Sequence, residues 1–497
     1  MRRTKVLATV GPATDSVDGM VALLRAGADA FRLNFSHGTD AEHRRTLQRL
    51  HAAARAAGRE CAIVADVQGP KLRIGDLTGN GVTLSTGQTW TLDHDPRPGD
   101  GRRVGIEIPA LERVAGRGDP VLLGDGSVEL VVLSATPESI GTRVVHGGFV
   151  GAHAGLFLPR ARLRSSVFAE KDRHDAAIAL EEGIDYLALS FVRNAADLDE
   201  VRRWLDRSPA GRTVGIIAKI ERAEALTSIG GIVERADGIM VARGDLGIEV
   251  PLERLALEQK MLIRRANAAG RFVIVATQML LSMMTSPRPS RAEATDVANA
   301  VLDGADAVML SEESAVGQFP VEAVRWLDRI ARATEGAYDP RPLRERIAGE
   351  ARRSSPERSV AAAAVHLAEG VDARAIVTPT HSGRTAQLVA GLRPACPVIA
   401  LSGVPETRRR LSLVAGVEAR PTPLHADLEQ LRREAARLVR ASGLRGHGPI
   451  VLTAGYPVEG RPTNLVTLVD PEEARAPRPS RAPRPARRDP RASVPPR

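Results

Sequence analysis

Residues 215–251 read GIIAKIERAEALTSIGGIVERADGIMVARGDLGIEVP, and this stretch indicates the fold because it contains a strand, a helix and a second strand in that order. Residues 215–218 and 238–241 are continuous apolar runs of strand length, typical of parallel strands buried on both faces. Between them, residues 223–235 have the apolar spacing of a helix. The stretch therefore predicts a right-handed crossover between two parallel strands.

Each of these two strands ends in charged residues. Lys219 and Glu221 close the first strand, and Arg243 and Asp245 close the second. Because parallel strands end at the same edge of a sheet, we expect the four charges to converge. Two carboxylates can hold a divalent metal while two cations neutralise a phosphate. A pair of solvated salt bridges on the rim is the alternative that this stretch alone leaves open.

Composition limits the class of protein. A chain of 497 residues is expected to form two or three domains. Aromatic residues make up only 3%, which argues against a base-stacking surface, and residues 471–497 contribute +5 of the net charge of +9. We therefore expect no nucleic-acid partner. The only two cysteines, Cys61 and Cys396, indicate neither a disulfide framework nor a zinc site, as is usual in the cytoplasm.

The N-terminal segment does not resemble a secretory signal. It begins with basic residues, but its apolar run is short and is broken by Gly11 and Pro12. No uninterrupted apolar run is long enough to cross a bilayer. We expect a cytoplasmic protein without a membrane partner.

Eight strand-like runs, each followed by a helical pattern, predict an α/β fold with a (β/α)8 TIM barrel. The runs are residues 5–10, 30–34, 62–67, 186–190, 215–218, 238–241, 272–276 and 307–310. In such barrels the chemistry gathers where the strands end. The polar residues at these ends are Arg32, Asn34, Ser36, Asp66, Ser190, Lys219, Glu221, Arg243, Asp245, Thr277, Gln278, Ser311 and Glu313.

Interruptions of the strand and helix alternation suggest four segments. Residues 1–68 and 164–340 form the expected barrel, and residues 69–163, with β-type runs and turn signals, form an all-β domain inserted after the third strand. An insertion in a loop over the catalytic face is placed to act as a lid, although a decorative insertion is the alternative. Residues 350–470 form a C-terminal α/β domain, and residues 471–497, rich in Pro and Arg, form a disordered tail.

A hydroxyl-rich turn in the C-terminal domain can hold a phosphate. Residues 378–385 read TPTHSGRT and lead from a strand into a helix, whose N-terminal N–H groups favour anions. An ordinary helix cap is the alternative. The candidate contacts to a phosphorylated effector are Thr380, Ser382, Gly383, Arg384 and Thr385.

Six motifs occur in a fixed order: TKVLATVGPAT at 4–14, RLNFSHG at 32–38, IIAKIE at 216–221, MVARGDLG at 240–247, ATQML at 276–280 and PRPSRAEATDVANAVLDGADAVMLS at 287–311. With these motifs the chain resembles the pyruvate kinases from residue 1 to about residue 470. The resemblance implies transfer of the phosphoryl group of phosphoenolpyruvate to ADP, giving pyruvate and ATP, with Mg²⁺ or Mn²⁺ as cofactor. It also implies a cytoplasmic homotetramer with an effector domain.

The resemblance implies roles for individual residues. Glu221 and Asp245 match the metal carboxylates, and Lys219 and Arg32 match the cations on the transferred phosphate. Backbone at Gly244 would receive the substrate carboxylate. Thr277 and Ser311 would position the water that protonates the enolate. Residues matching the nucleotide site are Arg73, Asn34 and His37.

Among the departures of the chain from the family pattern, two concern the binding of nucleotide and of K⁺. A lid lysine of many relatives is replaced by Ala154, so nucleotide binding or lid closure can differ. In many relatives K⁺ is held by groups matching Asn34, Ser36, Asp66 and a threonine, but here Val67 replaces the threonine and Lys71 replaces a nearby glutamate. The pair resembles the K⁺-independent branch of the family. An ammonium from Lys71 can take the place of K⁺, and a free cation beside it would be repelled.

Two other functions use the same residues. A lyase acting on a metal-bound pyruvate enolate would need the acidic pair but has no use for a nucleotide arginine such as Arg73. A non-catalytic sensor of sugar phosphates would need the turn at 378–385 but not a phosphoryl-transfer lysine such as Lys219. We therefore expect an active phosphotransferase.

Overall fold

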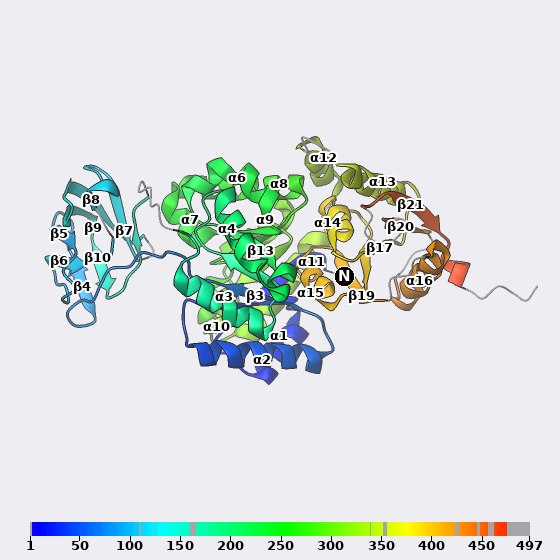
Figure 1. Cartoon of the computed structure of the whole chain (residues 1–497), viewed down its shortest axis with the longest axis horizontal. Coiled ribbons are helices and arrows are strands. Elements are labelled where there is room, and N and C mark those ends of the chain that lie inside the picture. Colours follow the sequence, from blue (N-terminus) through cyan, green and yellow to red (C-terminus); the bar gives the residue numbers. More distant parts are fainter. Residues whose placement is uncertain are drawn as a thin grey trace, which may run out of the picture.

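The computed structural model describes residues 2–108, 111–124, 126–159, 166–337, 339–350, 355–422, 427–444, 448–455 and 462–474. Three units lie in a row along the long axis of the molecule (Figure 1). A β-rich unit stands at one end, the barrel lies in the middle, and an α/β unit follows at the other end.

The predicted barrel is confirmed. Eight parallel strands close in the order β1-β16-β15-β14-β13-β12-β3-β2. They are β1 (Lys5–Val10), β2 (Ala30–Asn34), β3 (Ala62–Asp66), β12 (Tyr186–Leu189), β13 (Gly215–Ile220), β14 (Gly238–Ala242), β15 (Phe272–Ala276) and β16 (Ala307–Leu310). Along β15, Val273 and Val275 belong to the apolar cluster under the helices, whereas Ile274 and Ala276 face the barrel interior. Burial on both sides explains why these strands are continuous apolar runs.

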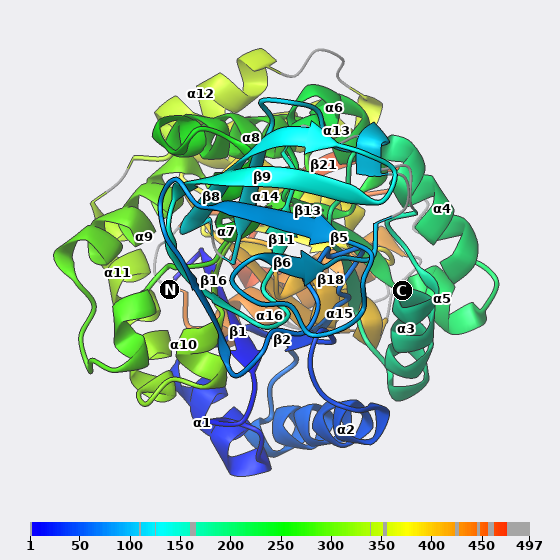
Figure 2. The same cartoon turned by 90° about the vertical axis from the view of Figure 1, so that its left-hand side faces the viewer.

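Helices surround the barrel, and the β-rich unit stands in front of one end of the ring that they form (Figure 2). The helical segments are α1 (Val17–Ala26), α2 (Asp40–Ala57), α3 (Glu170–Glu182), α4 (Ala195–Leu205), α5 (Pro209–Thr213), α6 (Ala223–Arg235), α7 (Arg243–Glu249), η2 (Leu252–Arg254), α8 (Leu255–Ala269), η3 (Leu281–Met284), α9 (Arg291–Asp303), α10 (Glu312–Ala315) and α11 (Pro320–Gly336). Their ends follow local signals. Helix α2 begins at a capping box of Thr39 and Glu42 and ends at Gly58, whose φ is 60°.

The segment after β3 forms a small β unit with its own core. A sheet of order β11-β7-β8-β9-β5-β6 lies beside the pair β10-β4. Its elements are β4 (Gly81–Leu84), β5 (Thr89–Asp93), β6 (Arg103–Gly105), η1 (Leu111–Arg113), β7 (Pro120–Leu123), β8 (Val128–Ala135), β9 (Ser139–His146), β10 (Gly148–Gly151) and β11 (Leu156–Phe157). Trp90 is fully buried in this core and donates its indole N–H to the carbonyl of Asp100 at 2.8 Å.

The C-terminal unit is a five-stranded sheet of order β19-β18-β17-β20-β21, in which β21 is antiparallel to β20. Its elements are α12 (Arg341–Glu350), α13 (Pro356–Gly370), β17 (Ala375–Pro379), α14 (Arg384–Gly391), β18 (Val398–Ser402), α15 (Pro405–Leu411), β19 (Val417–Pro421), α16 (Leu428–Ala441), β20 (Ile450–Ala454), β21 (Leu465–Val469) and η4 (Pro471–Ala474). The sequence did not predict β19, because this edge strand is only partly buried and carries charged residues.

The start of the predicted tail is ordered. Residues 471–474 form η4, and the Pro471 carbonyl accepts a hydrogen bond of 3.0 Å from Arg440 of α16. The boundary predicted at residue 471 therefore lies a few residues too early. The rest of the predicted tail, residues 475–497, lies outside the described residues.

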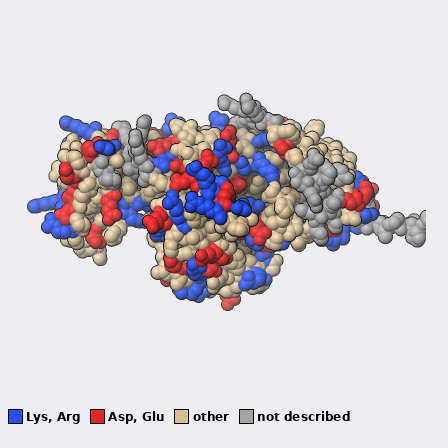
Figure 3. All heavy atoms as spheres, in the orientation of Figure 1, with Lys and Arg blue, Asp and Glu red and all other residues tan. Residues whose placement is uncertain are grey.

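Ion pairs join the C-terminal unit to the end of the barrel at which the strands begin. Arg408 pairs with Glu60 at 2.6 Å, and Arg409 pairs with the fully buried carboxylate of Asp185 at 2.9 Å. Elsewhere on the surface, basic and acidic side chains are interspersed over the face drawn in Figure 3. Among the described residues, no helix is both long and apolar enough to cross a membrane.

Candidate active site

Lys219 lies at the centre of the charged strand ends. Its ammonium nitrogen is 3.0 Å from Asp66 Oδ1 and 3.0 Å from Glu221 Oε1, and it donates to Ser190 Oγ at 2.6 Å. Burial by itself would lower the pKa of Lys219, but the two carboxylates raise it well above its usual range. The lysine is therefore a fixed positive charge at all relevant pH values. Sequence analysis placed Ser190 at a strand end but gave it no role.

Arg32 shares Asp66 with Lys219. Its Nε is 2.6 Å from Asp66 Oδ2, and its Nη1 donates to the Thr9 hydroxyl at 3.1 Å. Burial would raise the pKa of Asp66, but the charges of Arg32 and Lys219 hold it below its usual value. One buried carboxylate thus holds two cations in place before any ligand arrives, which is the arrangement that electrostatic stabilisation of a phosphoryl group needs.

Glu221 and Asp245 form an acidic pair beside Lys219. Burial raises the pKa of Glu221 against the opposing effect of Lys219, and the negative charge of Asp245 raises it further. The backbone N–H of Phe191, a residue with φ of 56°, donates to Glu221 Oε2 at 2.7 Å and orients the carboxylate. Sequence analysis could not find this contact, since a backbone N–H leaves no trace in residue type.

The acidic pair fits a divalent cation. Two carboxylates whose charges repel each other in a buried site gain from a cation between them, and Mg²⁺ commonly binds one or two carboxylates plus waters and substrate oxygens. Within the described part of the chain, no group of three or more His, Cys, Asp or Glu residues is arranged to hold a metal. Glu221 and Asp245 would therefore share the ion with substrate and water.

Thr277 and Gly244 face each other across neighbouring strand ends. The Gly244 N–H donates to Thr277 Oγ1 at 2.8 Å, so the group expected to receive a substrate carboxylate is occupied by this hydroxyl. Thr277 and Gln278 both have positive φ, 68° and 55°. Two consecutive strained residues after β15 indicate a loop whose shape is imposed by its surroundings.

Arg243 does not converge with the other charges, and this sequence prediction is wrong. Its guanidinium turns toward the loop after β15, where Nη2 donates to the Thr277 carbonyl at 2.7 Å and Nη1 pairs with Asp296 at 2.5 Å. Carbonyl groups and Asp296 satisfy the arginine, so it holds the strained loop instead of a phosphate. No role for Asp296 was predicted from the sequence.

Glu313 has a similar positioning role for Ser311. The carboxylate is buried, and it accepts hydrogen bonds from the Ser311 N–H at 2.7 Å and the Leu280 N–H at 3.0 Å. The segments after β15 and β16 are thereby tied together. Thr277 and Ser311, predicted to act together, lie on these two segments.

Lys71 lies beside Asp245 of the acidic pair and not at the expected cation site. Its ammonium nitrogen is 3.6 Å from Asp245 Oδ1 and lies 5.8 Å from the centre of the Phe157 ring. No contact with Asn34, Ser36 or Asp66 is present among the described residues. Asn34 Oδ1 instead accepts a hydrogen bond of 3.2 Å from the Ser36 N–H.

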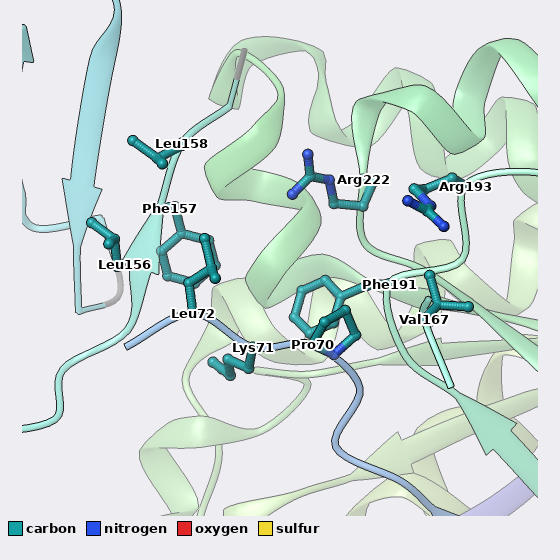
Figure 4. A pocket seen from close by; sticks show the side chains of 10 residues that line it. All are labelled: Pro70, Lys71, Leu72, Leu156, Phe157, Leu158, Val167, Phe191, Arg193 and Arg222. Carbon is teal, nitrogen blue, oxygen red and sulfur yellow. The ribbon is translucent and has the colours of Figure 1, made fainter. Parts of the chain in front are cut away.

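The two chain segments that connect the β unit to the barrel run side by side and line a hollow (Figure 4). Lys71 and Leu72 come from the outgoing segment and Phe157 from the returning one, and Phe191 lies on the barrel side. The Leu156 N–H donates to the Leu72 carbonyl at 3.0 Å. Movement of the β unit relative to the barrel must bend this pair of segments.

The remaining predicted nucleotide residues lie at the rim. Arg73 is in the same connecting pair, where its Nη1 donates to the His153 carbonyl at 2.9 Å. The His37 carbonyl contacts the ring of His43 at 2.8 Å, which fixes the loop after β2. Ala154 accepts a hydrogen bond from the Ile74 N–H with its carbonyl and offers no charge.

The effector turn, residues 378–385, is partly closed by hydrogen bonds that its own hydroxyl groups make. Thr380 Oγ1 accepts the Gly383 N–H at 2.9 Å, and the hydroxyls of Thr385 and Thr463 are 2.6 Å apart. The side chain of Arg384 leaves the turn and donates to the Gly270 carbonyl of the barrel at 3.1 Å. The structure therefore differs from the expectation that Arg384 lines the phosphate cradle.

A family profile described as "Pyruvate kinase, barrel domain" matches residues 1–324. The chain belongs to the pyruvate kinase family. A second pyruvate kinase profile, for the alpha/beta domain, matches residues 358–469.

Individual pyruvate kinases are similar over nearly the whole chain. The enzyme of Geobacillus stearothermophilus is 41% identical over 469 residues, which are 94% of this chain and 80% of that protein. The enzyme of Methylorubrum extorquens is 41% identical over 477 residues, covering 94% of this chain and 97% of that protein. A crystal structure of a pyruvate kinase from Cryptosporidium parvum superimposes with a TM-score of 0.89 at 35% identity, covering 94% and 96% of the two chains.

Glu249 gives a prediction about pH, since it is a buried carboxylate at the end of α7. Burial raises its pKa to about 7, although Arg222, at 3.4 Å, acts in the opposite direction. The folded protein therefore binds this proton more tightly than the unfolded chain does, and the stabilisation present below pH 4.5 is lost as the pH rises through 7. We expect the free energy of unfolding of Glu249→Gln, taken relative to that of the native protein, to rise by about 1–3 kcal/mol between pH 5 and pH 8.

Urea unfolding of both proteins at the two pH values measures this difference. Any constant offset from losing the contact with Arg222 cancels between the two pH values. Glu234→Gln, an exposed change on the neighbouring helix α6, serves as the control. A difference that does not change with pH would show that Glu249 does not titrate in this range.

Proposed function

We propose that this protein catalyses the pyruvate kinase reaction, the transfer of the phosphoryl group of phosphoenolpyruvate to ADP, and that Lys219 and Arg32 hold the transferred group. The observation that carries this is the buried carboxylate of Asp66, which fixes both cations at one strand-end position. A loose phosphoryl-transfer transition state spreads negative charge over the equatorial oxygens, and fixed cations stabilise it without reorganisation.

Glu221 and Asp245 would hold the divalent ion, Mg²⁺ or Mn²⁺, which neutralises phosphate charge and polarises the substrate oxygens when bound. For the substrate carboxylate to reach the Gly244 N–H, the Thr277 hydroxyl must first give up its bond to that group. Thr277 is then free to orient water toward the enolate carbon, with Ser311 on the adjoining segment. Arg243 and Glu313 keep both segments in place.

The lid, residues 69–163, would close by bending the connecting segments that carry Lys71 and Arg73. Closure brings the nucleotide phosphates, held by Arg73 and by the loop with Asn34 and His37, toward Lys219. Because Ala154 stands where many relatives have a lysine, the lid contributes less positive charge to the binding of the nucleotide phosphates. Exclusion of water by closure favours transfer to ADP over hydrolysis.

A coupled assay tests the reaction. Phosphoenolpyruvate, ADP and Mg²⁺ should give pyruvate and ATP in equal amounts. The lyase alternative, which the acidic pair by itself would also permit, predicts turnover of a carbonyl or enolate substrate without ATP formation. Pyruvate release without ATP would reject the proposal.

We further propose that Lys71 makes K⁺ unnecessary. Its ammonium lies 3.6 Å from Asp245 and supplies a tethered positive charge beside the phosphate site, where another monovalent cation would be repelled. Activity should therefore be similar in potassium and tetramethylammonium buffers of equal ionic strength, measured as kcat and KM for phosphoenolpyruvate. Lys71→Glu should lose at least about tenfold in turnover or acquire a K⁺ requirement.

Lys260→Met, on the outer face of the barrel, is the control for a lost lysine charge. Strong activation of the native protein by K⁺ at fixed ionic strength would contradict the proposal. It would instead favour a conventional monovalent site at Asn34, Ser36 and Asp66.

We also propose how the enzyme is regulated and assembled. A phosphorylated metabolite would bind the turn at Thr380, Ser382 and Thr385 with the N–H groups of α14, and the active form would be a cytoplasmic homotetramer. Ser382→Asp places a negative charge in the turn and should abolish activation by sugar phosphates or nucleoside monophosphates, with basal kcat unchanged. An unchanged response to every activator would place the effector site elsewhere.

A further inference from the structure

One buried carboxylate holds both chain connections between the barrel and the lid. Asp172 lies in the first turn of α3 and is 2% exposed. Its Oδ1 accepts the Gly69 N–H at 2.9 Å, and its Oδ2 accepts the Ala169 N–H at 2.9 Å. Gly69 belongs to the segment that leaves the barrel for the lid, and Ala169 follows the segment that returns. The side chain therefore bridges two parts of the chain that are far apart in sequence.

The bond to Ala169 alone would be an ordinary helix cap. Ala169 precedes α3 and has no side-chain oxygen, so Asp172 satisfies its N–H group in the manner of a capping box. The bond to Gly69 goes beyond this role, because Gly69 and Asp172 are 103 positions apart. Burial raises the pKa of Asp172, and the two N–H groups act in the opposite direction. Both backbone groups thus help to keep the buried carboxylate charged.

The outgoing segment is fixed to the barrel up to Gly69. The Ser190 hydroxyl donates to the Val67 carbonyl at 2.7 Å. Gly69 has a φ of 67°, and a Cβ at this position would lie 3.0 Å from Ser190 Cβ and 3.1 Å from Phe191 Cδ2. Glycine allows both this backbone conformation and this close approach. Ser190 and Phe191 also support the charged strand ends through the contacts described above, so the outgoing segment rests directly on that support.

The returning segment is fixed to the barrel before α3 begins. Val167 and Phe168 are buried, and the Phe168 ring meets Trp204 of α4 edge-on, with 5.2 Å between the ring centres. Pro70 and Val167, one from each connection, line the same hollow (Figure 4). The two connections are therefore anchored at neighbouring points, and Asp172 joins these anchors.

We propose that Asp172 is a positioning residue for the lid, because it joins the two connections at their hinge and fixes the point from which the lid closes. The inference rests on the proposed function, in which lid closure brings the nucleotide phosphates toward Lys219. Asp172 acts through the backbone of Gly69 and Ala169.

The bridge also sets the position of residues that we assign to the phosphate sites. The Lys71 N–H donates to the Gly69 carbonyl at 2.8 Å, and the Lys71 ammonium lies 3.6 Å from Asp245 Oδ1. Arg73 follows on the same segment. A shift of Gly69 away from Asp172 would therefore move Lys71 relative to the acidic pair and Arg73 relative to the nucleotide. Small displacements of groups that position a substrate are costly.

Hydrogen exchange with mass spectrometry on the full chain tests the bridge. Asp172→Ala removes both acceptors. We expect it to speed exchange about tenfold or more in peptides covering residues 67–74 and 166–173, because each N–H loses a hydrogen bond to a charged group.

Asp172→Ser is the second variant should the alanine variant fail to fold. Its single oxygen lies nearer the backbone and stays within the first turn of α3, so exchange should rise in residues 67–74 alone. If residues 67–74 exchange as in the native protein in a folded variant, Asp172 is only a helix cap and the proposal is overturned.

Steady-state kinetics test the role in positioning. KM for ADP should rise about fivefold or more in these variants, and KM for phosphoenolpyruvate should change less, because the lid contributes to nucleotide binding. A residue that only stabilised the fold would lower kcat through the fraction of active protein and leave both KM values unchanged. Faster exchange together with a native KM for ADP would overturn the positioning role.

Asp197→Ala is the matched control. Asp197 is a buried carboxylate at the corresponding position of α4, and its Oδ2 accepts the N–H groups of Arg193 and Asn194 at 2.9 and 3.3 Å, both at the start of its own helix. KM for ADP and exchange in residues 67–74 should equal those of the native protein. If the native protein forms no ATP from phosphoenolpyruvate and ADP, the proposed function fails, whereas the exchange measurement still decides whether the bridge exists.

Discussion

Replacing Lys219 by methionine should lower kcat about 1,000-fold or more, the largest effect expected for a single residue of this protein. Methionine keeps much of the length of the side chain but removes the charge that lies 3.0 Å from both Asp66 and Glu221. That charge is aimed at the transferred phosphoryl group, where stabilisation matters only in the transition state. KM for phosphoenolpyruvate should change much less than kcat.

The measurement must separate catalysis from folding, since removing one partner of a buried ion pair also destabilises the fold. Thermal unfolding of the variant shows whether it is folded, and Mn²⁺ binding followed by electron paramagnetic resonance shows whether Glu221 and Asp245 still hold a metal. Lys260→Met on the outer surface is the control. A folded Lys219→Met variant with near-normal turnover would remove Lys219 from the mechanism.

The second large effect is expected for Glu221→Gln. The amide keeps the shape of the side chain but removes half of the negative charge of the acidic pair. We expect kcat/KM to fall about 100-fold or more, and the Mg²⁺ concentration for half-maximal activity to rise about tenfold or more. Steady-state rates over a Mg²⁺ series provide both quantities.

Glu249→Gln supplies the matched control, because it neutralises another buried carboxylate of the same region that lies outside the acidic pair. Its Mg²⁺ requirement should equal that of the native protein. If Glu221→Gln also leaves the Mg²⁺ requirement unchanged, Asp245 and the substrate suffice to hold the metal, and Glu221 has only a structural role beside Lys219.

The barrel could be predicted from the sequence because its strands are buried on both faces. Burial produces continuous apolar runs such as residues 272–276, and the closed sheet fixes which end carries polar groups. The edge strand β19 was missed for the complementary reason, since Val417–Pro421 is partly exposed and carries charged residues. Pattern reasoning detects burial, and it fails where burial is incomplete.

By itself the sequence determined which polar residues follow the barrel strands. Because parallel strands end on the same side of the barrel, this also determined that Lys219, Asp66 and Glu221 lie close together. Only the tertiary structure decided where side chains in the following loops point. Arg243 turned to Asp296, Lys71 reached Asp245, and Arg384 left its turn for the barrel. Spacing along the chain encodes which face of a strand or helix is buried. The direction of a loop side chain depends on backbone angles, such as the positive φ after β15, and on partners far away in sequence.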